Sequence, residues 1–195
     1  MVPIRSLRFP AALAAIMLTL AGPVGAAPAD DLRDAQKLYA QGKFQPAAEK
    51  VDAFLKAQPK DAQGRFLKGL LLTEQKKTTE AIQVFTALTE DYPELSEPYN
   101  NLAVLYAAAG NYDKARSALE LATLTNPNYA IAHENLGDIY AQLAARAYDR
   151  AGNLDKNNAT ARAKLASVRQ MLDAQKPGAA TSTRIEPPKA GKPQT

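Results

Sequence analysis

The chain has 195 residues, a formal net charge of +4 at pH 7 and no cysteine. Without cysteine it has neither disulfides nor a lipid anchor on an N-terminal cysteine. Ala, Leu, Lys and Gln dominate the sequence, and alternating runs of Val, Ile and Thr are missing. This composition favours an all-α fold over a β-sheet.

Residues 1–26 have the features of a secretory signal peptide: two arginines, a short apolar run and then small residues. Cleavage after Ala26 or after Ala27 fits the pattern equally. The apolar run is shorter than the ~20 residues that span a bilayer, which favours cleavage over the alternative of an uncleaved membrane anchor. We therefore expect an exported, periplasmic protein with no stable membrane insertion after cleavage.

The chain that follows repeats with a period of 34 residues. The repeats occupy residues 28–61, 62–95, 96–129 and a shortened 130–158. Pro59, Pro93 and Pro127 recur in step with this period. Each of the first three repeats holds two segments with apolar residues at helical spacing, separated by a short turn. Each of these repeats is therefore predicted to form a helical hairpin.

The third repeat resembles the tetratricopeptide repeat (TPR) family. The matching positions are held by Tyr99, Leu102, Ala103, Tyr106, Gly110, Tyr112, Ala115, Leu119, Ala122 and Pro127. The resemblance implies a right-handed superhelical solenoid of helical hairpins over residues 27–174. The second repeat departs from the pattern at its turn, where Lys76 stands in the place of Gly110.

The fourth repeat lacks about five residues, the length of a turn. Tyr148 stands in the place that Phe85 holds in the second repeat, but it follows Tyr140 too closely for a turn. No Gly, Pro or Asn occurs in residues 139–150, and most residues there are strong helix formers. The two helices of this repeat are therefore predicted to fuse into one helix from about Ile131 to about Leu154.

This fused helix carries an apolar stripe at steps of three and four residues. The stripe consists of Leu136, Tyr140, Leu143, Ala147, Ala151 and Leu154. A capping helix over residues 159–174 is expected to fold back onto the stripe and end the solenoid. Its own apolar residues, Leu165, Val168 and Leu172, are expected to become buried there.

Residues 175–195 are rich in Pro, Gly, Ser, Thr and Lys, which predicts a disordered basic tail. Without the signal peptide and this tail, 18 basic and 19 acidic residues remain. The folded part is thus nearly neutral and has no basic field that would attract nucleic acid.

In the TPR family the first helices of successive repeats line a concave groove. The corresponding residues are Arg33, Gln36, Tyr39, Phe66, Leu67, Leu70, Thr73, Glu97, Asn100, Asn101, Val104, Glu134, Asn135 and Asp138. Asn101 and Asn135 stand where family members bind a peptide backbone, and amide side chains offer both donor and acceptor. The alternative is that both are ordinary solvated residues.

The sequence predicts neither a catalytic site nor a metal-binding site. The single histidine, His133, is expected to pack between helices, and the chain has too few His and Cys ligands for zinc. No phosphate-binding glycine loop or nucleophile motif occurs, so no cofactor is expected. The sequence favours a non-catalytic periplasmic scaffold that binds a peptide segment or partner protein. The alternative is a structural subunit or assembly factor of a cell-envelope complex.

The signal-peptide hypothesis gives a first testable prediction. Expression of the full sequence in a bacterium with a secretory pathway should yield a soluble periplasmic product that begins at Ala27 or Pro28. Intact mass and N-terminal sequencing of the product check the prediction. A product of full-length mass in the membrane fraction would refute it.

Overall fold

The computed structural model describes residues 26–174. Residues 1–25 of the predicted signal peptide and the predicted tail lie outside the described residues. The described part forms eight helices and no strand. They are α1 (Ala26–Ala40), α2 (Phe44–Ala57), α3 (Ala62–Glu74), α4 (Thr78–Asp91), α5 (Ser96–Ala108), α6 (Tyr112–Thr125), α7 (Ala130–Leu154) and α8 (Ala159–Ala174).

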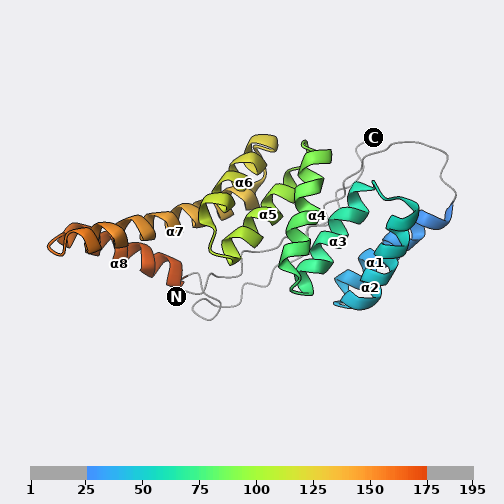
Figure 1. Cartoon of the computed structure of the whole chain (residues 1–195), viewed down its shortest axis with the longest axis horizontal. Helices are drawn as coiled ribbons and strands as arrows, with labels where there is room; N and C mark the ends of the chain where they lie inside the picture. The colour runs from blue at the N-terminus through green and yellow to red at the C-terminus, as the bar shows by residue number, and fades with distance from the viewer. Residues whose placement is uncertain (1–25, 175–195) are drawn as a thin grey trace, which may run out of the picture.

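The helices pack as consecutive antiparallel pairs, and the pairs stack along the long axis of the molecule (Figure 1). Each helix also contacts the next one along the chain, and α1 contacts α3 as α5 contacts α7. The predicted all-α solenoid of helical hairpins is thereby confirmed. The α7–α8 pair is longer than the others and extends away from the stack as an arm (Figure 1).

The turns inside the first three pairs share one backbone geometry. Gly42, Lys76 and Gly110, each 34 residues apart, all have positive φ, of 72°, 60° and 75°. After Lys76 the N–H of Lys77 donates to the carbonyl of Leu72 at 2.9 Å, which closes the helix end with a Schellman-type bond. The second repeat therefore keeps the family's turn without glycine, at the cost of a left-handed lysine.

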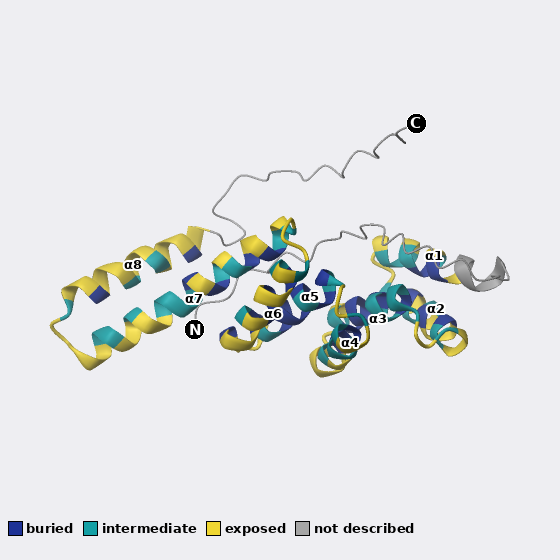
Figure 2. Cartoon of the chain, turned by 90° about the horizontal axis from the view of Figure 1, so that it is seen from above, coloured by how far each residue is buried: buried dark blue, intermediate teal, exposed yellow. Residues whose placement is uncertain are grey.

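Buried residues line the facing sides of the two helices of each pair (Figure 2). There a small residue meets a large one. A Cβ atom added to Gly69 on α3 would lie 2.6 Å from Cζ of the fully buried Phe85 on α4. In the next pair Ala103 and Leu119 take the same two places, and both are buried. The smaller partner thus lets the two helix backbones approach until the larger side chain fills the space.

The fourth repeat, residues 130–158, forms a single helix and not a hairpin of two helices. α7 runs without a break from Ala130 to Leu154, which confirms the predicted fusion. Arg146 ties its middle to the neighbouring pair, because its guanidinium donates to the carbonyl of Gly110 at 2.9 Å and lies 4.1 Å from the centre of the Tyr112 ring. The distal half of α7 then projects beyond α6.

α8 folds back along α7 as predicted, and Leu172 is buried. It covers a different side of α7 from the one predicted, however. Lys164 lies over the Tyr148 ring, and the guanidinium of Arg169 donates to Asp149 at 3.2 Å.

These contacts set α8 beside Ala141, Ala145, Tyr148 and Gly152, where small residues permit close approach. The predicted burial of Leu165 and Val168 is therefore only half realised. Much of the predicted stripe stays exposed, including Tyr140, Ala147 and Leu154.

The small-to-large fit predicts opposite effects of one substitution at equivalent positions of two repeats. Gly69→Ala should lower the free energy of unfolding by about 1–2 kcal/mol, because overpacking against Phe85 outweighs the gain in helix propensity. Gly137→Ala should raise it by about 1 kcal/mol, because nothing lies within 4 Å of a Cβ atom there. Urea unfolding followed by circular dichroism measures both, and changes of the same sign would contradict the described packing.

Candidate functional site

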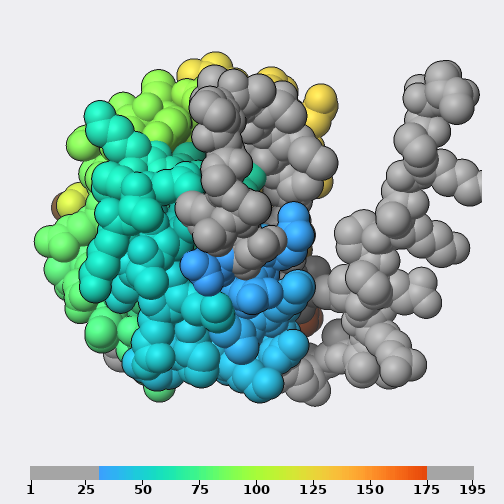
Figure 3. All heavy atoms as spheres, turned by 90° about the vertical axis from the view of Figure 1, so that its right-hand side faces the viewer, coloured from blue at the N-terminus to red at the C-terminus, as the bar shows by residue number. Residues whose placement is uncertain are grey.

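The predicted groove lies on the first helix of each pair, α1, α3, α5 and α7. Figure 3 views the stack from its N-terminal end, with α1 and α2 in front of the next pair. Exposure divides the predicted groove residues into three groups. Buried are Leu67, Leu70, Asn100, Asn101, Val104 and Asn135; half-buried are Gln36, Tyr39, Phe66, Thr73, Glu97 and Asp138; exposed are Arg33 and Glu134.

The apolar members of the predicted groove belong largely to the core. Leu67 lies in the cluster that α1, α2 and α3 share, and Leu70 and Val104 lie in the larger cluster that extends from α3 to α7. Phe66 is half-buried and packs its edge against the Phe85 ring, with centroids 5.6 Å apart. These side chains support the face from beneath, and the surface above them is less apolar than the sequence suggested.

The three asparagines form a buried polar cluster between α5 and α7. Asn135 on α7 donates its amide N–H to Oδ1 of Asn100 on α5 at 2.8 Å. Asn101 donates to the main-chain carbonyl of Glu97 at 2.9 Å. The structure thus brings together residues 35 positions apart in sequence, and it contradicts the alternative that they are ordinary solvated side chains.

Tyr129, which the sequence analysis did not single out, adds a phenol near Glu97, the residue whose carbonyl accepts from Asn101. It stands at the N-cap of α7, and its side chain is half-buried. Burial, and then the charge of Glu97, raise the pKa of its phenol from 10.0 to about 12. The repeat pattern gave this last residue of the third repeat no role, because its surroundings depend on the approach of α7 to α5.

The cluster keeps unused hydrogen-bonding capacity. Within residues 26–174, Nδ2 of Asn100, Oδ1 of Asn101 and the hydroxyl of Tyr129 are buried without a hydrogen-bond partner. A buried polar group without a partner costs roughly 1–3 kcal/mol, so such groups are rare in proteins unless water or a ligand satisfies them. One amide donor, one carbonyl acceptor and one hydroxyl together suit a ligand that both donates and accepts.

Carboxylates surround the polar cluster. Glu97 on α5 and Glu134 and Asp138 on α7 are half-buried or exposed on these helices. At the other end of the predicted groove, burial and the nearby Glu74 raise the pKa of the Tyr39 phenol to about 12. Among the predicted groove residues themselves, the carboxylates are Glu97, Glu134 and Asp138, so the acidic side chains of this set all lie on α5 and α7.

The described part of the chain shows neither a histidine-based catalytic site nor a metal site. His133 is exposed rather than packed between helices, and its Nε2 lies 3.0 Å from the carbonyl of Pro127. Residues 26–174 bring together no group of three or more metal-ligating side chains. The same residues include no helix long and apolar enough to cross a membrane.

Two family models, both described as tetratricopeptide repeat, match residues 32–96 and residues 72–143. Together they cover more than half of the chain. The chloroplastic tetratricopeptide repeat domain-containing protein PYG7 of Arabidopsis thaliana is 35% identical over 77 residues, which are 37% of this chain. The match spans only about a quarter of that relative's length, 26%.

Solved structures share the fold at lower identity. A thermophilic TPR protein of Thermus thermophilus superposes with a TM-score of 0.57 at 23% identity, over 75% of this chain and 83% of that chain. The first TPR of Spaghetti (RPAP3), bound to the HSP90 peptide SRMEEVD, gives 0.57 at 18% identity over 60% of this chain and 93% of that one. At these identities the likeness concerns the fold.

The unpartnered hydroxyl of Tyr129 gives a prediction with a pH dependence. Tyr129→Phe should raise the free energy of unfolding at pH 7 by about 1 kcal/mol or more, because it removes a buried hydroxyl that has no hydrogen-bond partner. Above pH 10 the phenol ionises more readily in the unfolded chain than in the folded one, so stability falls as the pH rises from 10 to 12. The substitution should make that fall shallower.

Urea unfolding at pH 7, 10 and 11 measures both effects. Tyr92→Phe serves as the control at pH 7, because it removes a hydrogen bond to the carbonyl of Lys60 and should cost about 1 kcal/mol. A loss as large for Tyr129→Phe would mean that its hydroxyl has a partner within the protein.

Proposed function

Because the chain belongs to the tetratricopeptide repeat family, we propose that it is a non-catalytic scaffold that binds a peptide segment of a partner protein. The ligand lies along the face of α1, α3, α5 and α7. The observation that carries the proposal is the buried polar cluster of Asn100, Asn101 and Tyr129, whose unused donor and acceptors point to an unmet hydrogen-bonding need.

An extended peptide backbone fits this need, because each of its amides both donates and accepts. A ligand carbonyl accepts from Nδ2 of Asn100, and a ligand N–H donates to Oδ1 of Asn101. The Asn100–Asn135 bond fixes the orientation of the Asn100 amide, so that its Nδ2 keeps one direction for a ligand carbonyl.

The negative charge on the face of α1, α3, α5 and α7 determines which peptides it favours. Glu97, Glu134 and Asp138 disfavour an acidic ligand and favour a neutral or basic one with apolar side chains. One structural neighbour was solved with a peptide that ends in EEVD. Chaperone-binding family members clamp a C-terminal carboxylate with Lys, Asn and Arg. None of the corresponding positions here is positively charged, so we propose a different peptide class; they are Leu32, Gln36, Leu67, Glu97 and Asn101.

We further propose that the scaffold works in the periplasm and has neither nucleic acid nor a membrane as its partner. The support is the signal-peptide pattern of residues 1–26 and the near balance of 18 basic and 19 acidic residues between signal peptide and tail.

A peptide array tests the ligand class, and fluorescence anisotropy then measures the affinity of selected peptides. Neutral and basic apolar peptides should bind, and the affinity of the basic ones should fall with rising salt. The triple variant Glu97→Gln, Glu134→Gln and Asp138→Asn should bind basic peptides several-fold more weakly. It should keep the circular dichroism of the unchanged protein.

The matched control carries the same charge change on the second helices, as Glu80→Gln, Glu90→Gln and Asp113→Asn. These three side chains are exposed on α4 and α6, so the control should bind as the unchanged protein does. Equal weakening by both triple variants would point to net charge alone, and strong selection of acidic C-terminal peptides would overturn the proposal.

A further inference from the structure

α8 packs on the side of α7 that also carries two carboxylates of the predicted groove. Residues at alternating steps of four and three lie on one side of a helix. On α7 one such side consists of Glu134, Asp138, Ala141, Ala145, Tyr148 and Gly152. α8 covers the distal part of this side, where Lys164 lies over the Tyr148 ring. Glu134 and Asp138 form the proximal part of the same side.

The end of α8 lies at the level of Asp138 along α7. α8 runs back along α7 toward the stack (Figure 2). Ala174 stands ten residues after Lys164, and Asp138 stands ten residues before Tyr148. Since both helices rise 1.5 Å per residue, Ala174 and Asp138 each lie about 15 Å from the contact of Lys164 with Tyr148, in the same direction. A chain that leaves α8 at Ala174 therefore starts near the last part of the face of α1, α3, α5 and α7.

This last part is the acidic end of the face, which we define as Glu97, Glu134 and Asp138. The stretches that carry these carboxylates, residues 93–111 and 126–145, contain neither lysine nor arginine. The one basic member of the predicted groove, Arg33, stands on α1 at the opposite end. The acidic end therefore favours a basic ligand.

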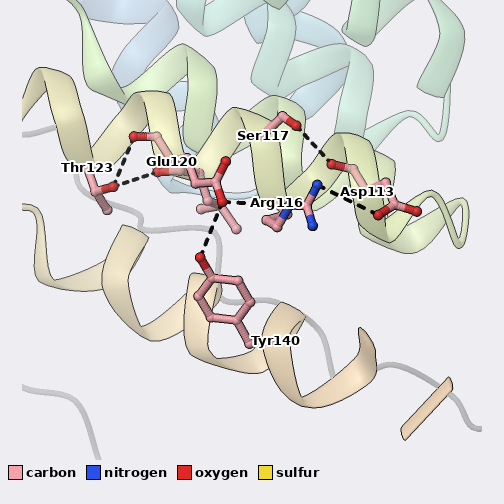
Figure 4. Close-up of polar contacts among 7 residues, drawn as sticks. Asp113, Arg116, Ser117, Glu120, Thr123 and Tyr140 are labelled. Atoms are coloured by element: carbon pink, nitrogen blue, oxygen red, sulfur yellow. Dashed lines mark hydrogen bonds and ion pairs between the residues drawn. The ribbon is translucent and has the colours of Figure 1, made fainter. Parts of the chain in front are cut away.

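The neighbouring second helix, α6, balances its own carboxylates. Nε of Arg116 lies 3.6 Å from Oε1 of Glu120, and the guanidinium of the same arginine lies 3.9 Å from Oδ1 of Asp113 (Figure 4). A basic segment thus gains less from α6 than from the acidic end of the face.

Residues 175–195 have the composition of a ligand for the acidic end. They hold a single carboxylate, that of Glu186, and four basic side chains, those of Lys176, Arg184, Lys189 and Lys192. Ile185 and four prolines add apolar groups. This is the basic, apolar class of peptide proposed above for the face.

The connection to α8 is long enough for this segment to reach the acidic end. The ten residues from Ala174 to Arg184 span up to about 33 Å when extended. Neighbouring packed helices lie only about 10 Å apart, so Arg184 can reach Glu97 on α5 as well as the carboxylates on α7.

We propose that residues 175–195 bind in cis to the acidic end and compete there with the peptide of a partner protein. The inference rests on the proposed function, because it requires that the face binds peptides of this class. A segment tethered by a short linker acts at an effective concentration of about 1 mM. With an intrinsic Kd of about 100 µM, it lowers the affinity for an added peptide about tenfold.

A fluorescently labelled synthetic peptide with the sequence of residues 175–195 tests whether the segment binds. It is titrated into the full chain carrying Arg184→Gln, Lys189→Gln and Lys192→Gln, which we call the tail variant. Fluorescence anisotropy should show binding that weakens as salt rises. The unchanged protein should bind the peptide about tenfold more weakly, because its own segment competes.

A second set of substitutions locates the binding. Glu97→Gln, Glu134→Gln and Asp138→Asn, added to the tail variant, should weaken its binding of the synthetic peptide several-fold. Undiminished binding would mean that the segment binds elsewhere, which overturns the inference. Circular dichroism checks that each variant keeps the fold.

A basic peptide selected on the array then tests the competition. It should bind the tail variant about tenfold more tightly than the unchanged protein, at every protein concentration, because the segment and the face belong to one molecule. The matched control removes the same charge from exposed side chains at α2, as Lys43→Gln, Lys56→Gln and Lys60→Gln, and should bind as the unchanged protein does.

The failure of this inference and that of the proposed function give different results. If array peptides bind but the synthetic peptide does not bind the tail variant at about 1 mM, the inference is wrong and the proposed function stands. If the synthetic peptide binds and no array peptide does, the proposed function is wrong. If neither binds, both are wrong.

Two further outcomes overturn the inference. An equal gain in affinity for the tail variant and the control at α2 would mean that net charge acts alone. A gain that disappears on dilution of the protein would mean that the segment reaches the face of a second copy rather than its own.

Discussion

The fit of a small residue under a large one between the two helices of each pair is the contact on which the solenoid depends. Gly69 under Phe85 is its tightest instance, since even one methyl group at Gly69 would collide with the ring. This close approach fixes the angle within each pair, and the pairs then bury their remaining faces on one another. The fourth repeat, which lacks the second helix, therefore exposes what the others bury.

Much of the fold was predictable because it is encoded locally. The 34-residue period, the proline positions and the missing turn before Tyr148 are all readable along the chain, and they predicted the hairpins and the fused α7. Even the turn without glycine kept its geometry, because Lys76 adopts the left-handed conformation of Gly42 and Gly110 and the N–H of Lys77 closes the helix end on Leu72.

The parts that could not be predicted depend on contacts between distant residues. Which side of α7 meets α8 is set by pairs such as Arg169 with Asp149, which helical periodicity does not reveal. The same holds for the candidate site. The sequence placed Asn101 and Asn135 at equivalent positions of the groove, but only the approach of α7 to α5 shows that both are buried and that Asn135 bonds to Asn100. The packing of α3 against α1 and α2, which buries Leu67, was equally hidden.

The missing turn affects one side of α7 and leaves the other as it is in the earlier repeats. On α7, Asn135 faces α5, whereas Tyr140, Ala147 and Leu154 lie about 100–140° around the helix axis from it. The uncovered stripe and the buried asparagines therefore lie on different sides of the same helix. The loss of one turn exposes the stripe, because the helix that would cover it has become the distal half of α7. It leaves the contact between Asn135 and Asn100 in place, because that contact depends only on the proximal half of α7 and on α5.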